Sequence, residues 1–297
     1  MKHLYIIGNG FDIHTGLKTQ FTDFVGWLER NYPFISEDLN KAYNFEGKDW
    51  HDFETELGKL DIHEYVQRFT PTQLSENEII KNVVSKNVHH ENDDNIPSLY
   101  EKTPCANRLR GLLDVLQYCF TKWVEDVTKN YSEKKRIKII KEDSYFINFN
   151  YTDTLELLYN IPENKVCHIH GRVSKHERLI FGHRGNNLTI NGSHDEDRTQ
   201  FELNIFEKNP YEYIYRNNLQ SLLLDDVKQI HVYGFSFSQV DEDYMDWIYK
   251  HTPHNCIWEI SFYTLDDKKR IETFISDYPD LLVRTKMIKL DALTISR

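Results

Sequence analysis

The sequence predicts an α/β protein in which a parallel β-sheet carries helices on both of its faces. Short apolar runs alternate along the chain with segments whose apolar residues recur at helical spacing. The first run ends directly in a glycine-rich turn, and a helical pattern follows that turn. A long helical stretch then interrupts the alternation. This order favours one sheet domain with a large helical insertion after the first strand unit.

The predicted strands are short runs of apolar and β-branched residues. The first, Leu4–Ile7, is apolar at every position, as expected of a strand that is buried on both faces. The alternation of such runs with helices predicts a Rossmann-like parallel sheet. The predicted strands cover residues 4–7, 144–149, 165–169, 178–181, 229–233, 256–263 and 285–290, and further helices lie at about 200–226, 240–251 and 266–278.

The helices of the first strand unit and of the insertion are predicted from periodicity. A first helix is expected from Thr19 onward, because Phe21, Phe24 and Leu28 recur at spacings of three and four residues. A stripe of apolar residues from Leu109 to Tyr131 predicts a long helix within the insertion. The expected domains are a Rossmann-like, sheet-containing domain over residues 1–44 and 141–297, and a helical insertion over residues 45–140.

Within the insertion, the segment from Thr70 to Pro104 is polar and predicts an excursion on the surface. Its two adjacent histidines, His89 and His90, lie among Asn, Asp and Glu residues. We expect them to be solvated rather than bound to a metal.

Composition limits the classes of function. A chain of 297 residues with 39% hydrophobic residues can bury a sizeable core, and the aromatic content of 13% favours aromatic packing. The formal net charge of -11 opposes binding to nucleic acid and to anionic membranes. A small anionic ligand stays compatible with this charge, because backbone amides can bind phosphate locally.

The cysteines and the hydropathy pattern indicate the compartment. Cys105, Cys119, Cys167 and Cys256 lie far apart, so they predict neither a disulfide framework nor a zinc site. No apolar segment has the length of a signal peptide or a membrane span. A cytoplasmic protein without a membrane partner is expected.

The glycine-rich turn, Gly8-Asn9-Gly10-Phe11-Asp12, is the first candidate for ligand binding. Glycines directly after a strand let backbone amides approach a phosphate group that a Cβ atom would block. The third glycine, Gly16, follows Gly10 too late for the dehydrogenase pattern G-x-G-x-x-G, which disfavours an ordinary dehydrogenase. The alternative is a purely structural turn between strand and helix.

Two further polar segments follow predicted strands, at the edge where ligands of open parallel sheets bind. The first runs from Asn148 to Asp153, and the second is His168-Ile169-His170-Gly171. In an extended segment, His168 and His170 would share a face, and with His183 they could ligate a metal. A single catalytic imidazole at His170 needs fewer assumptions, so no metal is predicted.

A fourth segment, Tyr233 to Ser238, again leads from a strand through a Gly/Ser loop to a helix. Gly234 and Ser236 could contact a ribose or a phosphate, whereas Ser238 or Asp241 could simply cap the helix. A hydrolase with a nucleophilic serine is disfavoured, because Ser238 replaces the second glycine of G-x-S-x-G.

The four segments together resemble the sirtuin superfamily. Gly8-Asn9-Gly10-Phe11-Asp12, Asn148-Phe149-Asn150-Tyr151, His170-Gly171 and Gly234-Phe235-Ser236-Phe237 match in order its glycine loop, Asn motif, His-Gly and Gly-x-Ser loop. The chain also resembles the AbiH family of phage abortive-infection proteins. This second resemblance is carried by the residues of the glycine loop and by the segments from Gly16 to Phe24, Trp50 to Glu54 and Gly234 to Asp241. This resemblance spans nearly the whole chain.

The resemblance implies an NAD site with the glycine loop over the pyrophosphate. Asn150 would position a water or the ribose near the nicotinamide bond, and His170 would act on the ribose hydroxyls. The expected activity is hydrolysis of NAD at the nicotinamide N-glycosidic bond; the alternative is an inactive sensor that binds NAD or ADP-ribose. The remaining residues expected to bind the nucleotide are Gly8, Asn9, Gly10, Phe11, Asp12, Tyr151, Gly234, Ser236 and Asp241.

Two departures from the sirtuin pattern narrow the expected activity. Thr152 stands where sirtuins carry an aspartate two residues after the asparagine, and Asp153 comes one place later. The cysteine pairs of the deacetylases' zinc module are absent, which disfavours protein deacylation. A second copy of the chain or a phage-derived trigger are the macromolecular partners left open.

Overall fold

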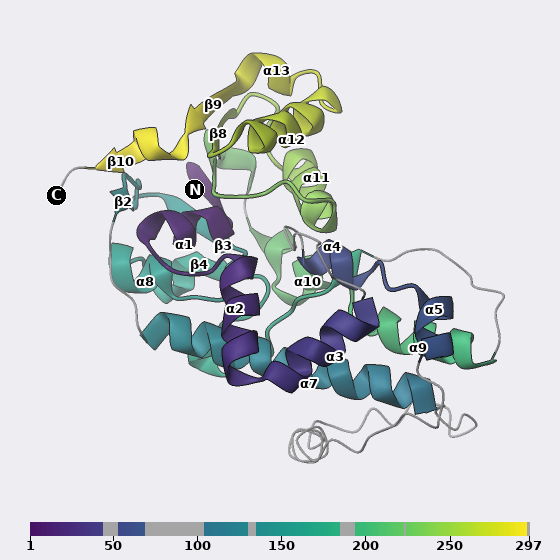
Figure 1. The fold of residues 1–297 in the computed structure, drawn as a ribbon. Coiled ribbons are helices and arrows are strands. Elements are labelled where there is room, and N and C mark those ends of the chain that lie inside the picture. Colours follow the sequence, from purple (N-terminus) through teal and green to yellow (C-terminus); the bar gives the residue numbers. More distant parts are fainter. Residues whose placement is uncertain (44–52, 69–103, 130–134, 185–193, 223, 296–297) are drawn as a thin grey trace. The chain divides into compact units, whose positions relative to one another are not determined.

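We analysed the fold in a computed structural model of the chain (Figure 1). The structure describes residues 1–297 except 44–52, 69–103, 130–134, 185–193, 223 and 296–297. The predicted excursion from Thr70, with His89 and His90, therefore lies outside the described residues. The chain folds into two compact units: the first comprises Met1–Gln20, Val124–Ile180 and Asn209–Arg297, and the second comprises Phe21–Trp123 and Phe181–Lys208.

The first unit is built on a six-stranded sheet with the order β4-β3-β1-β7-β8-β9. All neighbouring strands run parallel. The chain proceeds outward from β1 to β4, returns to β7 beside β1, and continues to β9, so the direction of progression reverses between β1 and β7. The strands are β1 (His3–Ile7), β3 (Ser144–Asn148), β4 (Val166–His168), β7 (Gln229–Tyr233), β8 (Ile257–Phe262) and β9 (Thr285–Lys289).

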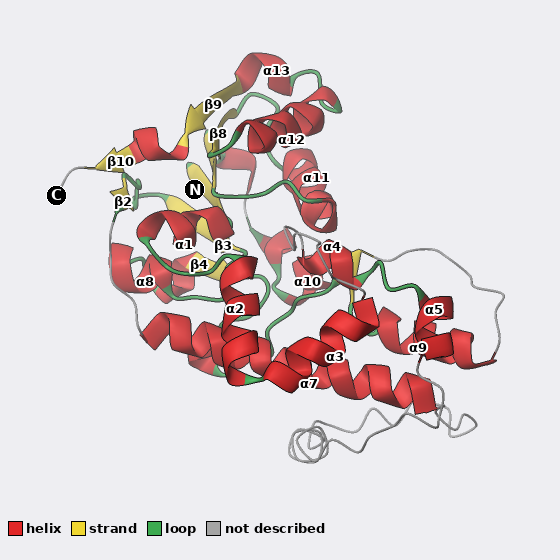
Figure 2. Cartoon of the chain, in the orientation of Figure 1, coloured by secondary structure: helices red, strands yellow, loops and turns green. Residues whose placement is uncertain are grey.

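Helices cover both faces of this sheet (Figure 2). In β1, Leu4 and Ile6 belong to one apolar cluster and Tyr5 and Ile7 to the other, which explains why every position of the strand is apolar. The predicted parallel α/β sheet is confirmed. The first cluster includes side chains of α10 (Pro210–Arg216), α11 (Glu242–His251), α12 (Leu265–Ser276) and α13 (Leu281–Arg284), and the second includes side chains of α1 (Asn9–Thr15) and α8 (Thr154–Tyr159).

Two predicted elements differ from the structure. Residues 178–181 form a loop rather than a strand, since their apolar side chains are buried by packing without a strand ladder. The predicted helix over about 200–226 is divided into α9 (His194–Asn204) and α10. Asn209 starts α10 by accepting a hydrogen bond from the Glu212 amide, and Pro210 takes the first helical position.

The described part of the second unit is mainly helical. Phe24 packs its ring against Phe120 and Trp123, with centroid distances of 5.5 and 5.2 Å, so the helix predicted after Thr19 packs within this unit. In the predicted division this helix belongs to residues 1–44. The helices are α2 (Phe21–Asn31), α3 (Pro33–Tyr43), α4 (Phe53–Leu57), α5 (Ile62–Arg68), α9 and most of α7 (Pro104–Lys129), and β5 (His183–Arg184) pairs with β6 (Glu207–Lys208).

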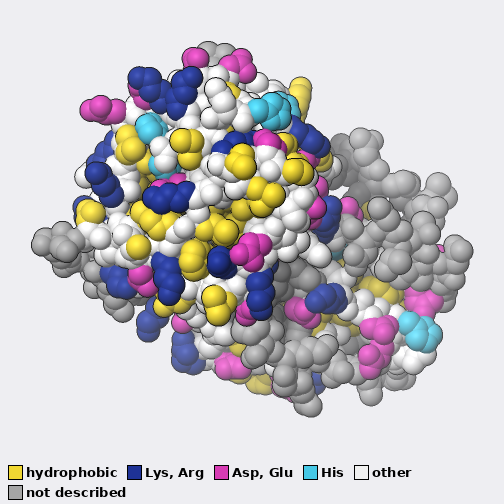
Figure 3. All heavy atoms as spheres, turned by 90° about the horizontal axis from the view of Figure 1, so that it is seen from above, with side chains coloured by type: hydrophobic (Ala, Val, Ile, Leu, Met, Phe, Trp, Pro, Cys, Tyr) yellow, Lys and Arg dark blue, Asp and Glu magenta, His cyan; other side chains and the backbone are white. Residues whose placement is uncertain are grey.

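None of the helices in the described ranges combines the length and the apolar character that a membrane span requires. On the face shown in Figure 3, basic and acidic side chains are interspersed among hydrophobic ones. That face therefore carries charges of both signs side by side.

A buried polar chain crosses one face of the sheet. Tyr233 donates to Glu259 over 2.6 Å, so His231 Nδ1, 3.1 Å from the Tyr233 hydroxyl, acts as the donor of that pair. His231 Nε2 then accepts from His3 Nδ1 at 3.2 Å, and the Tyr5 ring stacks on His231 at 4.3 Å. A neutral His231 satisfies all of these contacts, and burial lowers its pKa to about 4.

This burial predicts acid sensitivity. Because His231 binds a proton less readily in the folded state than in the unfolded chain, its contribution to stability is lost as the pH falls from about 6.5 towards 4. We expect His231→Gln to reduce that loss by about 3 kcal/mol. Urea denaturation of both proteins at pH 7 and pH 4.5 measures the difference; equal pH dependence in the two proteins would exclude a neutral, buried His231.

Candidate functional site

Two glycine-containing loops meet at the carboxyl edge of the sheet, between β1 and β7. Gly8 donates its amide to Tyr233 O at 3.0 Å, and Gly10 donates to Gly234 O at 2.8 Å. A Cβ atom on Gly8 would lie 2.7 Å from Gly234 O, and one on Gly10 would lie 2.9 Å from Gly234 Cα. Gly234 itself has φ of +65°, and its Cβ atom would lie 2.0 Å from Phe11 N. Backbone-to-backbone contact therefore requires all three glycines.

Other features of the first loop are structural. The Phe11 ring is fully buried and packs against Tyr159 at 5.4 Å, on the core side of α1. Gly16 ends α1 in the left-handed conformation with φ of 107°, which explains why its spacing departs from the dehydrogenase pattern. As the first residue of α1, Asn9 has an amide that the helix leaves free.

Asn150 connects β3 to the first loop. The residue lies two positions beyond the end of β3 and is 4% exposed. Its Nδ2 donates to Gly8 O at 3.1 Å, and its own amide is held by Asn148 Oδ1 at 3.0 Å. Its Oδ1 receives no hydrogen bond from the described residues. The side chain is thus fixed at its nitrogen and available at its oxygen.

Asp12 lies beside this asparagine as a buried carboxyl group. Its Oδ2 accepts a hydrogen bond from Thr152 Oγ1 at 2.5 Å, and Thr152 Oγ1 is 3.0 Å from Thr154 Oγ1. Oδ1 is buried and has no partner among the described residues. Burial raises the Asp12 pKa to about 6, while hydrogen bonds from Thr152, Thr154 and Asn150 act in the opposite direction.

His170 occupies an aromatic environment on the other side of the loop after β3. The Phe149 ring packs edge-on against His170 at 5.3 Å and against Phe235 at 4.9 Å. His170 Nε2 lies 3.3 Å from the Tyr244 hydroxyl, and the residue is 2% exposed. Through Phe149, the histidine loop thus contacts the loop that follows β7.

Two further predicted site residues, Asn9 and Tyr151, form hydrogen bonds outside the contact between the two glycine loops. Asn9 is exposed, but its Nδ2 donates to Thr19 O at 2.6 Å, which ties the chain after α1 to the loop. Tyr151 is half-buried; it donates its hydroxyl to Ile180 O at 3.0 Å, and its ring lies 6.3 Å from that of His170. Neither side chain connects the loop after β1 to the loop after β7.

The segment after Gly234 supplies an exposed serine and a neighbouring arginine. Ser236 is exposed, and Arg270 Nε donates to its carbonyl oxygen at 2.7 Å. Asp241 is buried directly before α11, and neither its side chain nor that of Ser238 caps a helix there. Sequence reasoning missed Arg270, since it comes from α12 and no motif connects it to the loop.

The three histidines considered as metal ligands do not assemble. The chain turns after His168, with Gly171 N donating to His168 O at 3.2 Å, so His168 and His170 do not share a face as an extended segment would require. His183 belongs to the second unit, where its ring nitrogens lie 3.0 and 3.1 Å from the carbonyl oxygens of Arg184 and Leu203.

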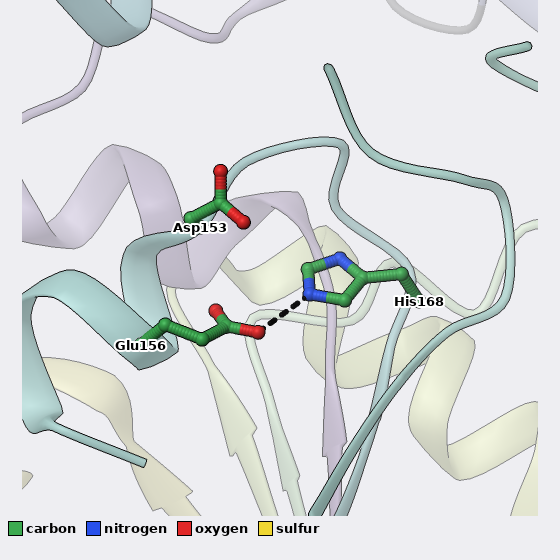
Figure 4. Close-up of side chains that lie close together, drawn as sticks. All are labelled: Asp153, Glu156 and His168. Carbon is green, nitrogen blue, oxygen red and sulfur yellow. Dashed lines mark hydrogen bonds and ion pairs between the residues drawn. The ribbon is translucent and has the colours of Figure 1, made fainter. Parts of the chain in front are cut away.

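His168 instead joins two carboxylates, as Figure 4 shows. Asp153, Glu156 and His168 bring possible metal-ligating atoms within 4.8 Å of one another, and His168 Nε2 lies 2.8 Å from Glu156 Oε1. Arg172 Nη1, however, lies 3.1 Å from Asp153 Oδ1 and 3.4 Å from Glu156 Oε1. The guanidinium thus supplies the positive charge that a metal ion would provide. The sequence did not reveal this cluster, although its members all lie within residues 153–172, because His168 was expected to share a face with His170 and Arg172 belongs to no motif.

The comparison with protein families supports the AbiH part of the resemblance seen in the motifs. The model of the family described as "Bacteriophage abortive infection AbiH" matches residues 4–262, a range that includes the glycine loop, Asn150, His170 and Gly234. No curated protein matches the chain. Because the family model covers most of its length, the chain belongs to the AbiH family of bacteriophage abortive infection proteins.

Proposed function

We propose that this protein acts in phage abortive infection by hydrolysing NAD at the nicotinamide N-glycosidic bond, in a Rossmann-like, sirtuin-type site. One observation carries the proposal. Asn150 and His170 each follow the end of one of two neighbouring parallel strands, and both are connected to the glycine loops of β1 and β7. Loss of NAD would deprive an infected cell of its redox cofactor and thereby stop the metabolism on which phage replication depends.

The position of the site supports a dinucleotide ligand. The strand order matches that of doubly wound dinucleotide-binding sheets, in which ligands bind outside the carboxyl ends of the strands where the order reverses. The reversal in this protein is between β1 and β7, where the Gly8 and Gly234 loops meet. The exposed Asn9 and Ser236 are the parts of these loops that a pyrophosphate or ribose would meet first.

The two polar side chains suit the chemistry. In the hydrolysis, the bond between ribose C1′ and the nicotinamide nitrogen breaks, its electron pair leaves with nicotinamide, and a water oxygen bonds to C1′ while releasing a proton. Asn150 Oδ1, which is free of donors among the described residues, would accept a hydrogen bond from that water. The His170 imidazole would accept a proton from a ribose hydroxyl near neutral pH.

Nicotinamide release from NAD by the purified protein tests this proposal. We expect Asn150→Ala and His170→Ala each to lower the rate by about 100-fold or more. The exposed residues Asn164 and His254 provide matched controls, and Asn164→Ala and His254→Ala are expected to keep the wild-type rate. Circular dichroism confirms that each variant is folded. Wild-type rates in both site variants would exclude this assignment of the site.

A sensor that binds the nucleotide without turning it over is the second candidate. It is favoured by the burial of Asn150 and His170, which are 4% and 2% exposed, and by the loop amides of Gly8 and Gly10 that are already bonded within the chain. Calorimetry with NAD and with ADP-ribose separates the two functions. Binding of both ligands without any nicotinamide release would support the sensor.

A further inference from the structure

Arg270, on α12, has a guanidinium group that the protein holds at two points. Its Nε donates to Ser236 O at 2.7 Å, and its Nη2 donates to Asp267 Oδ1 at 2.5 Å. Nη1 forms no hydrogen bond or ion pair with the described residues, and the side chain is 45% exposed. The guanidinium therefore has a fixed orientation and keeps N–H donors that no group in the described part of the chain uses.

The two contacts place this guanidinium at the carboxyl edge of the sheet. Ser236 belongs to the loop after β7. Asp267 Oδ2 accepts from the amides of Tyr263 and Thr264, which directly follow β8, at 3.1 and 2.7 Å. Ligands of doubly wound sheets bind outside this edge. Arg270 thus connects the loops after β7 and β8, next to the reversal between β1 and β7.

The loop after β7 has a strained backbone beside Arg270. Phe237 has φ of 53°, a conformation that bulky residues rarely adopt. Its ring packs against Phe235 and Phe274 at 5.2 and 5.1 Å. Arg270 binds the preceding carbonyl group, Ser236 O. Because residues kept in such conformations are concentrated at ligand sites, the loop has a shape that suits ligand binding as well as the connection of two elements.

The hydrogen bonds of Asp267 determine which group is left for a ligand. Both of its carboxylate oxygens already accept within the protein, Oδ2 from two backbone amides and Oδ1 from the guanidinium. The groups that remain are the N–H donors of Arg270. A planar guanidinium matches two oxygens of a phosphate group, with which it forms charge-assisted hydrogen bonds. This geometry therefore selects a phosphate.

We propose that Arg270 is a specificity-determining residue of the nucleotide site, where its guanidinium binds a phosphate group of the ligand. That phosphate is either part of the pyrophosphate or the 2′-phosphate of a phosphorylated ribose, since both present the same oxygens. The inference rests on the proposed function for the nucleotide nature of the ligand. It does not depend on turnover, so binding of ADP-ribose can test it.

Calorimetry with ADP-ribose and with its 2′-phosphorylated form measures the contribution of Arg270. We expect Arg270→Gln to weaken binding of at least one of these ligands by about 10-fold or more, because charge-assisted hydrogen bonds to phosphate are lost. An equal loss for both ligands assigns the guanidinium to the pyrophosphate, and a loss confined to the phosphorylated form assigns it to the 2′-phosphate. Circular dichroism confirms that the variant is folded.

Lys269→Gln is the matched control, because it removes an exposed charge from the same helix. It should change both affinities by less than about 2-fold. Unchanged affinities in Arg270→Gln, or a wild-type protein that binds neither ligand, would overturn the proposal.

Asp267→Asn separates phosphate binding from a merely structural role of the ion pair. Asparagine can still accept from the amides of Tyr263 and Thr264, whereas the ion pair with Arg270 is lost. The ligand that Arg270→Gln weakens should bind this variant about 2-fold more tightly or better, because a negative charge near the phosphate is removed. A loss as large as that in Arg270→Gln would show that the ion pair only holds the loop, and would overturn the proposal.

Kinetics distinguish a failure of this inference from a failure of the proposed function. If ligand binding depends on Arg270 but NAD is not cleaved, the hydrolysis is excluded and the phosphate contact stands. If NAD and NADP are cleaved with the same KM values in Arg270→Gln as in the wild-type protein, the hydrolysis stands and the phosphate contact is excluded.

Discussion

Gly234→Ala is expected to destabilise the protein by about 4 kcal/mol or more, or to prevent folding. The new Cβ atom would lie 2.0 Å from Phe11 N and 2.5 Å from Gly10 C, and backbone atoms have no other rotamer to adopt. The backbone at this position has φ of +65°, a conformation that itself costs about 1–2 kcal/mol for alanine. To accommodate the methyl group, the loops after β1 and β7 must separate.

That separation would also break the hydrogen bond from Gly10 N to Gly234 O. Chemical denaturation followed by circular dichroism measures the loss. Gly26→Ala is the matched control: Gly26 lies within α2, its Cβ atom would meet only the flexible end of Arg30 at 3.3 Å, and alanine favours the helix by up to about 1 kcal/mol. Equal stability of the two variants would contradict the close contact between the loops.

Arg172→Met is expected to destabilise the protein at pH 7 by about 3–5 kcal/mol. The Arg172 side chain is 9% exposed and lies between the carboxylates of Asp153 and Glu156, at 3.1 and 3.4 Å. Removal of the guanidinium leaves two buried carboxylates together without their shared cation.

Urea denaturation at pH 7 tests this expectation. Arg216→Met removes an exposed arginine from an i,i+4 pair with Glu212 and should change stability by less than about 0.5 kcal/mol. A loss in Arg172→Met no larger than that in Arg216→Met would contradict the role of Arg172 as the counter-charge of the cluster.

The fold was largely predictable because its signals are local. The strands at Leu4–Ile7 and Gln229–Tyr233 are apolar runs that end at glycines, and α12 begins with a capping box between Thr264 and Asp267. Such patterns depend on residues close in sequence. The strand predicted over residues 178–181 was wrong, because an apolar run indicates that side chains are buried but does not indicate whether the backbone pairs with a neighbouring strand.

The candidate site was predictable in part. Parallel strands bring their carboxyl ends to one edge, so Asn150 and His170 were expected near the glycine loops once their strands were identified. The sequence did not indicate that Gly8 and Gly10 form a close backbone contact with Gly234, because the two loops are more than 200 residues apart in the chain. Arg270 was missed because it comes from α12, a different element 34 residues from Ser236.

By itself, the sequence of this protein determined the class of fold, the order of its motifs and the resemblance to AbiH, since these depend on local periodicity and on short motifs. The tertiary structure decided which polar groups meet. It placed the Thr152 hydroxyl against the carboxyl group of Asp12, and it placed His168 in the cluster of Arg172 rather than beside His170. Those pairings depend on burial and on contacts between distant segments, which determine whether a charge is stabilised, shared or left without a partner.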